Sequence, residues 1–299
     1  MSEIARGIQG AMAGRNTDVD LPLLQRVMAL AVAAGEAILP FYDAGRQVRV
    51  ERKADQSPVT EADYAADRLL KAELPSVLPI PVLSEESEIP SFAERAAWAR
   101  YWLVDPLDGT REFLAGSGEF AVNIALIVDG EPILGVVYAP ASGTGYGGLK
   151  GRGAFRYEDD RYQLIRGRSM SARREAGEPL TLVASRRHGT ELLAQVRAAL
   201  ARQFGDVVVR PLGSSLKQCR VAEGFADLSL QYWPTSEWDT AAGQVVVEAA
   251  GGMLVDTHFR PLRYNRTPSL LNPSFYVIAD RTFDWEAALR PLAGMRVLK

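Results

Sequence analysis

The chain contains very little cysteine and histidine. Cys219 is the only cysteine, and His188 and His258 are the only histidines among 299 residues. A single cysteine excludes an intrachain disulfide, and two histidines exclude a zinc site with three histidine ligands. Acidic residues number 37, and carboxylate oxygens suit hard ions such as Mg²⁺, Ca²⁺ or Mn²⁺. We therefore expect any metal in this protein to be a hard ion.

The sequence also lacks a large charge excess and a long hydrophobic run. Its 34 basic and 37 acidic residues give a net charge of −3, which excludes strong attraction to a nucleic-acid polymer. With 47% hydrophobic residues, the chain is too apolar to be intrinsically disordered. The first helix candidate is uncharged only over 27–35, short of the roughly 20 residues that span a membrane. With no secretory pattern visible, we expect a cytoplasmic protein without a membrane span.

Hydrophobic patterning divides the chain into two halves. The first half contains a helix over 20–42, a helix from Thr60, short strands at 81–83 and 101–104, a hairpin of 120–128 with 133–138, and a glycine-rich loop up to 149. The second half alternates: strand 180–184, helix 190–203, strand 206–210, helix 216–222, strand 227–231 and helix 237–250. We predict a flexible extension at 1–19, an α+β half over 20–170 and an α/β half over 171–299.

The densest chemical motif is the segment Asp-Pro-Leu-Asp-Gly-Thr at 105–110. Asp105 and Asp108, three residues apart after an apolar strand, can converge on one group of cations, and the Leu107 carbonyl is available as a further ligand. Gly109 lets the backbone approach an anion closely, and the following N–H groups suit a phosphate. The alternative is a surface turn, because Asp, Pro and Gly dominate turns.

Three other acidic segments also have structural alternatives. The segments 60–63 and 236–239 fit the capping-box pattern, in which the last carboxylate satisfies a helix terminus. The segment 84–87, Ser-Glu-Glu-Ser, fits a solvated loop. Together, however, these segments place carboxylates at the ends of apolar elements, where a metal site needs them.

The order of these motifs resembles that of the inositol monophosphatase superfamily over about 21–280. Residues 102–110, followed by 119–126, resemble its first signature, and 238–243, continuing to 248–252, resemble its second. The upstream acidic segments match at 57–63 and 81–86. Within the superfamily, 83–86, 213–217 and 222–224 look most like the bacterial 3′(2′),5′-bisphosphate nucleotidase branch. The resemblance implies a layered αβαβα sandwich that combines the α+β and α/β halves.

The resemblance also implies a metal centre of two Mg²⁺ ions. Glu85, Asp105 and the Leu107 carbonyl would hold one ion, and Asp105, Asp108 and Asp239 would hold the second. Clustered carboxylates repel one another without cations, and two metals suit phosphoryl transfer. The resemblance thus implies an enzyme that needs no covalent intermediate.

The same resemblance assigns the phosphate and the attacking water. The phosphate would accept hydrogen bonds from the Gly109 and Thr110 N–H groups. Thr110, paired with Asp63, would orient the water, and Asp63 would assist a third, weaker ion. The implied catalytic residues are therefore Thr110, Asp63 and Glu85.

Substrate contacts are also implied by the resemblance. They are Gly109, Thr110, His188, Gly213, Ser214, Ser215, Lys217 and Asp239. One position departs from the branch, because Gln231 stands where an arginine is usual before the second signature. Losing a bidentate anion-binding group is not conservative, and Arg210 and Arg220 are the candidates to compensate.

We expect a phosphomonoesterase that hydrolyses adenosine 3′,5′-bisphosphate to AMP and phosphate, with a small phosphorylated molecule as its partner. One alternative keeps the mechanism but takes an inositol phosphate or another sugar phosphate. A second alternative is a catalytically silent metal-binding regulatory protein. The resemblance implies inhibition by Li⁺ and leaves monomer and homodimer open. A basic segment with arginines at 161, 166, 168, 173 and 174 either recruits anions or forms a solvated face.

Overall fold

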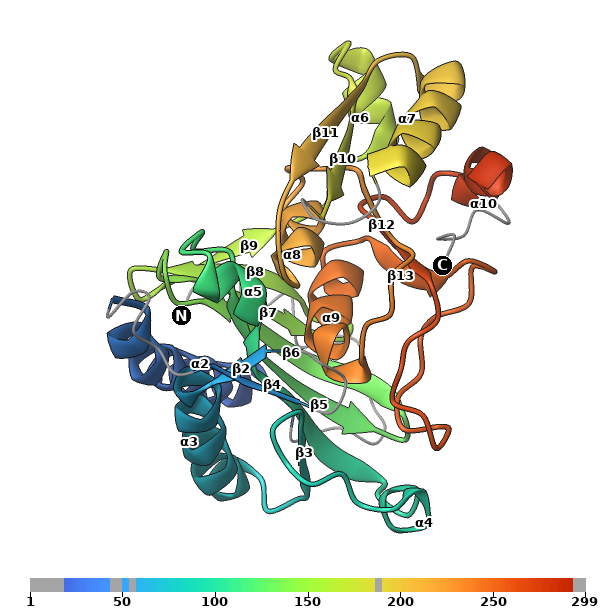
Figure 1. Ribbon diagram of the computed structural model, residues 1–299. Coiled ribbons are helices and arrows are strands. Elements are labelled where there is room, and N and C mark those ends of the chain that lie inside the picture. The colour runs from blue at the N-terminus through green and yellow to red at the C-terminus, as the bar shows by residue number, and fades with distance from the viewer. Residues whose placement is uncertain (1–18, 44–49, 54–57, 186–189, 293–299) are drawn as a thin grey trace, which may run out of the picture.

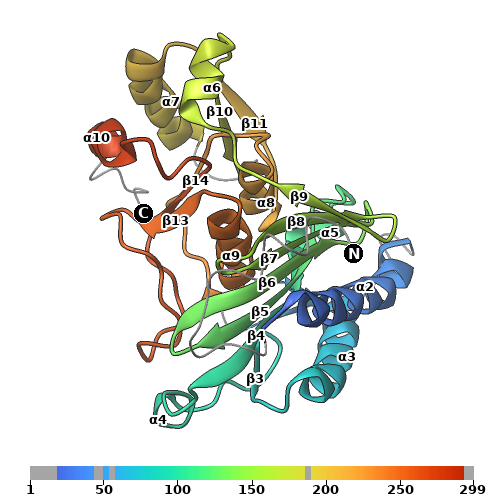
Figure 2. The ribbon, with the colours of Figure 1, turned by 180° about the vertical axis from the view of Figure 1, so that it is seen from behind.

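The computed structural model describes residues 19–43, 50–53, 58–185 and 190–292 (Figure 1). His188 and most of the predicted N-terminal extension lie outside the described residues. The described residues form alternating layers of helices and sheets, as Figures 1 and 2 show from opposite sides. This arrangement confirms the predicted αβαβα sandwich.

Two helices cover the outer face of the larger sheet (Figure 2): α2 (Leu21–Asp43) and α3 (Glu61–Val77). The predicted N-caps of both are present, since the Leu23 N–H donates to Asp20 Oδ1 at 2.9 Å and the Thr60 side chain accepts from Ala62 N–H. Among the described residues, α2 alone is long and apolar enough to cross a membrane, but 44% of its most apolar window is buried. Its buried side chains pack on the sheet, as in the core helix of a globular domain.

The larger sheet has the strand order β3-β4-β5-β6-β7-β8-β9. Its strands are β3 (Val82–Ser84), β4 (Arg100–Asp108), β5 (Ala121–Val128), β6 (Glu131–Ala139), β7 (Thr144–Leu149), β8 (Gly153–Glu158) and β9 (Arg161–Ile165). The β3–β4 pair is parallel and the other pairs are antiparallel. A small antiparallel pair, β1 (Val50–Arg52) with β2 (Pro58–Thr60), precedes α3. The predicted hairpin is β5–β6, and its turn has positive φ angles at Asp129 and Gly130, as tight hairpin turns require.

Two predictions for this half were wrong. The strand at 101–104 does not stop at Asp105, because β4 continues to Asp108 through a register shift between Asp105 and Asp108. Pro106 is tolerated there because a bulge removes the need for its missing N–H. The glycine-rich run at 143–149 is also not a loop, because most of it forms β7, whose glycines allow close packing on both faces.

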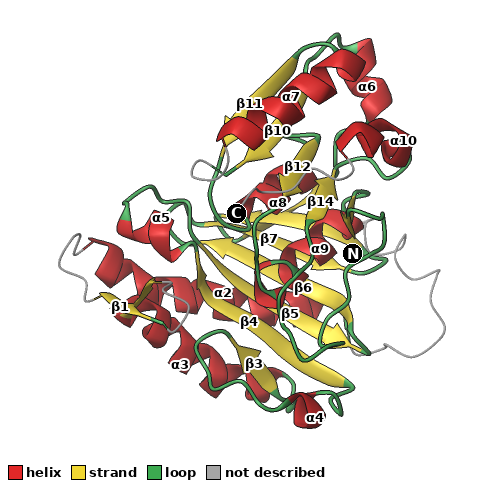
Figure 3. Cartoon of the chain, turned by 45° about the vertical axis from the view of Figure 1, so that its right-hand side comes forward, coloured by secondary structure: helices red, strands yellow, loops and turns green. Residues whose placement is uncertain are grey.

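The smaller sheet has the order β11-β10-β12-β14-β13 (Figure 3). Its strands are β10 (Leu180–Ala184), β11 (Val207–Pro211), β12 (Leu228–Gln231), β13 (Met253–Asp256) and β14 (Phe275–Ile278). Strand β10 is parallel to β11 and to β12, while β14 is antiparallel to β12 and β13. Its outer face carries α6 (Met170–Glu175), α7 (Thr190–Phe204) and α10 (Trp285–Leu289). The short elements are α4 (Phe92–Arg95), α5 (Thr110–Leu114), η2 (Glu237–Asp239) and η3 (Arg290–Leu292).

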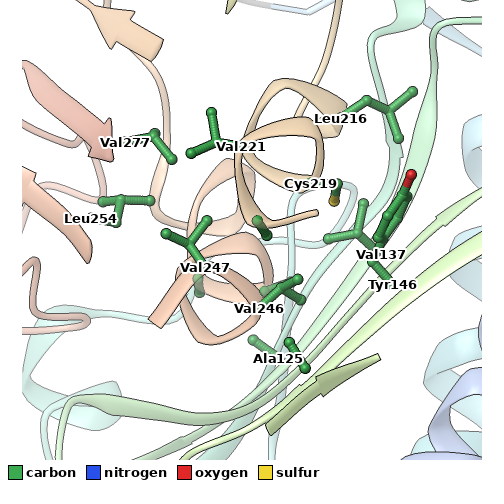
Figure 4. Close-up of a cluster of buried hydrophobic side chains, with 14 of the residues drawn as sticks. Ala125, Val137, Tyr146, Leu216, Cys219, Val221, Val246, Val247, Leu254 and Val277 are labelled. Carbon is green, nitrogen blue, oxygen red and sulfur yellow. The ribbon is translucent and has the colours of Figure 1, made fainter. Parts of the chain in front are cut away.

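Helices α8 (Leu216–Ala222) and α9 (Ala241–Ala249) lie between the two sheets (Figure 4). Val221 of α8 and Val247 of α9 face Val277 of the smaller sheet, while Val246 faces Ala125 of the larger one. The helix predicted over 237–250 is interrupted, because η2 ends at Asp239 and α9 begins only after Thr240. This interruption turns the segment that carries Asp239 toward the ends of β3 and β4.

Candidate metal and phosphate site

Three carboxylates from distant parts of the sequence meet at one point. Glu85 follows β3, Asp105 lies in β4, and Asp239 ends η2. Each offers an oxygen atom, and these three atoms all lie within 4.8 Å of one another. Asp105 is only 1% exposed. The fold therefore creates a compact acidic centre, which joins the first half of the chain to the second.

The acidic centre is electrostatically unfavourable without a cation. Burial raises the pKa of Asp105 well above its usual value, and the charges of Glu85 and Asp108 raise it further. Burial likewise raises the pKa of Asp239, with added repulsion from Asp108 and Glu85. Buried carboxylates of this kind gain most from a bound cation, and an all-oxygen donor set suits a hard one.

Lys53 supplies one cation to this centre. Its Nζ lies 2.7 Å from Glu85 Oε1 and 2.6 Å from Glu86 Oε1. Burial opposes its charge, but the two carboxylates outweigh burial and raise the pKa of Lys53. No motif in the sequence indicates this contact, because Lys53 lies 32 and 33 residues before Glu85 and Glu86 and belongs to no motif itself.

Asp63 and Thr110 form a pair beside the acidic centre. Asp63 Oδ2 accepts hydrogen bonds from the Thr60 N–H at 2.8 Å and the Thr60 hydroxyl at 2.6 Å, which completes the predicted capping box. Its other oxygen, Oδ1, accepts from Thr110 Oγ1 at 3.3 Å. Burial raises the pKa of Asp63 to about 6, although the Thr60 hydrogen bonds oppose this rise. Asp63 therefore both caps α3 and orients a hydroxyl group, so the two interpretations of this residue are compatible.

Asp108 links the acidic motif to the segment 213–215. The Ser215 N–H donates to Asp108 Oδ2, and Ser215 Oγ donates to Asn123 Oδ1 at 2.8 Å. Gly109 has a φ of +92°, and a Cβ there would lie 3.2 Å from Ser214 Cβ and 3.1 Å from the Glu119 carbonyl oxygen. Position 109 therefore requires glycine for both its conformation and its space.

Lys217 is half-buried and lies two residues after Ser215. Its Nζ donates to the Ser214 carbonyl at 2.7 Å. Burial lowers the pKa of Lys217, while Asp108, Glu112 and other nearby carboxylates oppose that shift. The predicted residues Gly213, Ser214, Ser215 and Lys217 are thus brought next to the acidic motif, whereas His188 lies outside the described residues.

A buried network fixes the segment that carries Asp239. The Ser236 N–H donates to Asp239 Oδ2 at 2.7 Å, which completes the second capping box. The carboxylate of Glu237 accepts the Asn265 N–H at 2.9 and 2.8 Å. Arg95, which is 1% exposed, donates to Asn265 Oδ1 and to the Thr267 carbonyl. These positioning contacts join residues far apart in the sequence, so no local pattern predicts them.

The side-chain amide of Gln231 does not replace the guanidinium group of the arginine that is usual at this position. Its Nε2 donates to the Trp233 carbonyl at 3.2 Å, which ties the side chain to the turn after β12. Gln231 and Trp233 also line a small apolar cavity with residues of β10 and α7.

The chain matches a family model and several characterised proteins. The model described as the inositol monophosphatase family matches residues 21–287. The 3′(2′),5′-bisphosphate nucleotidase CysQ of Shigella flexneri is 46% identical over 256 residues, covering 85% of this chain and 99% of the relative. The CysQ nucleotidase of Haemophilus influenzae is 37% identical over 266 residues, covering 89% and 96%.

Solved structures show the same architecture. CysQ from Bacteroides thetaiotaomicron, a bacterial member of the inositol monophosphatase family, is 38% identical with a TM-score of 0.72 and covers 86% of this chain and 97% of its own. The extragenic suppressor protein suhB from Bartonella henselae is 25% identical with a TM-score of 0.72 and covers 92% and 100%.

Proposed function

The chain belongs to the inositol monophosphatase family, and from this premise we propose that it hydrolyses adenosine 3′,5′-bisphosphate to AMP and phosphate with Mg²⁺ as its cofactor. The family and the nucleotidase relatives make it a phosphoric monoester hydrolase. The observation that carries the proposal is the meeting of Glu85, Asp105 and Asp239 beside the Asp63–Thr110 pair. The nucleotide is chosen because the CysQ relatives share up to 46% identity over 85% of the chain.

The oxygen atoms of the acidic centre are suitable ligands for Mg²⁺, which prefers oxygen ligands. In this proposal Glu85, Asp105 and the Leu107 carbonyl hold one ion, and Asp105, Asp108 and Asp239 hold the second. A third, weaker ion would lie near Asp63. When bound, the ions neutralise charge on the phosphate and on the leaving oxygen.

The chain's own residues then position the reactants. The Gly109 and Thr110 N–H groups donate to the phosphate, while Thr110 Oγ1, oriented by Asp63, holds a water molecule. That water would attack phosphorus in line with the ribose 3′-oxygen, and the bond between phosphorus and this oxygen would break as the new one forms. One proton of the water would end on the departing 3′-oxygen, and the other would stay on the released phosphate. Glu85 and Lys53 keep the opposite side of the centre in place through their 2.7 Å ion pair.

The substrate's second phosphate and its nucleoside are assigned to the segment 213–217, with His188 as a further contact. One observation favours the alternative of an inositol or other sugar phosphate: the amide of Gln231 is bonded to the Trp233 carbonyl instead of facing a second phosphate. A silent regulatory protein is disfavoured by the Asp63–Thr110 pair, since a protein that only binds metal has no need to orient water.

A phosphate-release assay with Mg²⁺ tests these alternatives. We would compare adenosine 3′,5′-bisphosphate, inositol 1-phosphate and fructose 1,6-bisphosphate at equal concentrations. We expect the nucleotide to have the highest kcat/KM. Preference for inositol 1-phosphate would overturn the nucleotide assignment, and the absence of turnover with every ester would overturn the proposed enzyme.

The Gln231→Arg variant tests the substrate position directly. If an arginine at 231 reaches the second phosphate, KM for adenosine 3′,5′-bisphosphate should fall about tenfold, because a charge-assisted pair contributes more than a neutral one. The KM for inositol 1-phosphate serves as the internal control and should not change. Equal KM values for the nucleotide in both proteins would exclude position 231 from specificity.

Inhibition by Li⁺ and a cytoplasmic location complete the proposal. Li⁺ at millimolar concentration should lower the rate of phosphate release when Mg²⁺ is kept constant. We propose no choice between a monomer and a homodimer.

A further inference from the structure

A cavity of about 540 Å³ lies away from the acidic centre. Its lining residues come from α6, α7 and the beginning of β11, three elements that lie together in Figure 1. Residues 206–208 at the start of β11 line it, whereas the segment 213–215 follows the end of the same strand. The strand has five residues, so at about 3.3 Å per step its two ends lie roughly 13 Å apart. The cavity is therefore separate from the proposed active site.

One wall of this cavity contains a buried arginine with unused donors. Arg173 is only 4% exposed, and its Nη1 donates to the Glu178 carbonyl at 2.7 Å. Among the described residues, its buried Nε has no hydrogen-bond partner, and its guanidinium carbon lies 5.9 Å from the centre of the Phe204 ring. Burial lowers the pKa of Arg173, and the neighbouring charges of Arg168 and Arg174 lower it further, against Asp227 and Glu178. The guanidinium of Arg173 therefore lacks a full set of hydrogen-bond partners.

Two further arginines line the cavity without carboxylate partners. Arg174 lies over the ring of Phe283 at 5.3 Å, and Arg197 is exposed on α7. Within the described part of the chain, neither forms an ion pair. The cavity wall has three arginines against two acidic residues, Glu178 and Asp206, and Glu178 is already paired with Arg168. The lining therefore has an excess of positive charge.

We propose that this cavity binds a phosphate monoester. Guanidinium groups donate two parallel hydrogen bonds to phosphate oxygens, and Arg174 and Arg197 approach the cavity from different helices. The cavity volume falls within the range for small organic ligands and exceeds what an inorganic ion needs. Phe204 and Val208 supply an apolar wall for the organic part of the ester. Bound phosphate would connect α6 to α7, and Arg168 of the basic segment holds the adjoining loop through Glu178.

Binding of AMP to the metal-free protein tests this site. The full chain in EDTA at low ionic strength is titrated by calorimetry, because removing Mg²⁺ leaves the acidic centre repulsive to phosphate. We expect AMP to bind with one site per chain, and more tightly than inorganic phosphate. The Arg174→Gln/Arg197→Gln double variant should weaken AMP binding at least tenfold. Both side chains are on helix surfaces, so we expect the variant to keep its thermal midpoint and its Mg²⁺-dependent phosphate release.

The matched control is Lys217→Met, which removes a cation next to the acidic motif and leaves the cavity intact. We expect it to bind AMP as the unchanged protein does. If AMP binding is lost in Lys217→Met and kept in the double variant, the nucleotide occupies the active site and the proposal is wrong. The proposal also fails if the unchanged protein binds neither AMP nor inorganic phosphate. These outcomes do not depend on turnover, so they are independent of the proposed enzyme activity.

Discussion

Asp108, in the segment 105–110, accepts a hydrogen bond and also carries a negative charge. A substitution can separate these two contributions. Asp108 Oδ2 accepts the Ser215 N–H and lies 3.5 Å from Asn123 Nδ2, and its charge raises the pKa of Asp105 and Asp239, whose burial is the larger cause. In Asp108→Asn the amide oxygen still accepts the Ser215 N–H, but the charged ligand that we propose for the second ion is lost. We expect kcat/KM for phosphate release to fall at least about 100-fold, while the thermal midpoint changes little.

Asp159→Asn is the matched control for that experiment. Asp159 is exposed in the β8–β9 turn with a φ of 49°, a conformation that asparagine also tolerates. We expect unchanged activity and stability. Full activity in Asp108→Asn would remove Asp108 from the proposed second metal site.

Asp280 is a buried carboxylate that makes stability depend on pH. Burial tends to raise its pKa, but donors from Thr282, Met170 and Phe283 outweigh burial and lower it. The Met170 N–H donates at 2.8 Å and the Thr282 hydroxyl at 2.6 Å. A group whose pKa is lower in the folded state stabilises the protein above its unfolded pKa and loses this contribution as the pH falls through the folded value.

Asp280→Asn should therefore lower the free energy of unfolding by about 1–3 kcal/mol at pH 7, because either orientation of the amide places its NH₂ group against an N–H donor. Urea denaturation at several pH values measures the difference between the two proteins. The difference should shrink below the model-peptide pKa of about 3.9. A difference that stays constant down to pH 3 would contradict this account of Asp280.

Only those residues of the acidic centre that lie in local sequence motifs could be predicted from the sequence. Glu85, Asp105 and Asp239 were identified because each lies in a short acidic segment, and the order of these segments resembles that of the inositol monophosphatase superfamily. Lys53 and Arg95 were missed because their contacts depend on tertiary structure, with partners 32 and 170 residues away. Long-range ion pairs of this kind have no signal in a single sequence.

At the scale of elements, paired glycines allow α9 to lie directly on the larger sheet. Gly135 of β6 and Gly148 of β7 are opposite each other in the ladder. A Cβ at Gly135 would lie 2.2 Å from the Ala242 carbonyl oxygen, and one at Gly148 would lie 2.7 Å from the Val246 N. The glycine-rich segment that we predicted as a loop is therefore a strand against which α9 packs directly.

Gly148→Ala should destabilise the protein by about 1–3 kcal/mol, because the new methyl group meets helix backbone that cannot yield locally. Gly147→Ala is the matched control on the same strand. Its Cβ faces only the Leu24 side chain, with the closest atom at 3.0 Å, so we expect a smaller loss. Thermal denaturation of both variants measures the difference, and equal losses would show that α9 adapts to the added volume.

Element boundaries were predicted well where caps are local and poorly where tertiary packing decides. Helix α8 begins and ends as expected at 216 and 222, and α2 begins directly after its Asp20 cap. In contrast, β4 passes through Asp105 because β5 continues to pair with it beyond the bulge. The break at Thr240 is stabilised by Tyr264 and Asn272, whose side chains both contact the Thr240 hydroxyl.

At the scale of the molecule, the two predicted halves share one core. A single buried cluster includes Leu103 and Val137 of the larger sheet, Val246 of α9, and Leu254 and Val277 of the smaller sheet. The division of the chain between β9 and β10 therefore separates two sheets that share this cluster, and each sheet also packs on a second cluster along its outer face. The proposed domain boundary near 170 remains a prediction about sequence organisation.

The acidic centre lies across this division, so metal binding should depend on both halves. Glu85 and Asp105 come from the larger sheet and Asp239 from the segment before α9. A ligand that binds only the folded state stabilises it by about 2.7 kcal/mol at 100 times its Kd. We therefore expect Mg²⁺ to raise the thermal midpoint. Asp105→Asn and Asp239→Asn should each abolish most of the shift, whereas Asp159→Asn should keep it. A full shift in either ligand variant would remove that carboxylate from the metal centre.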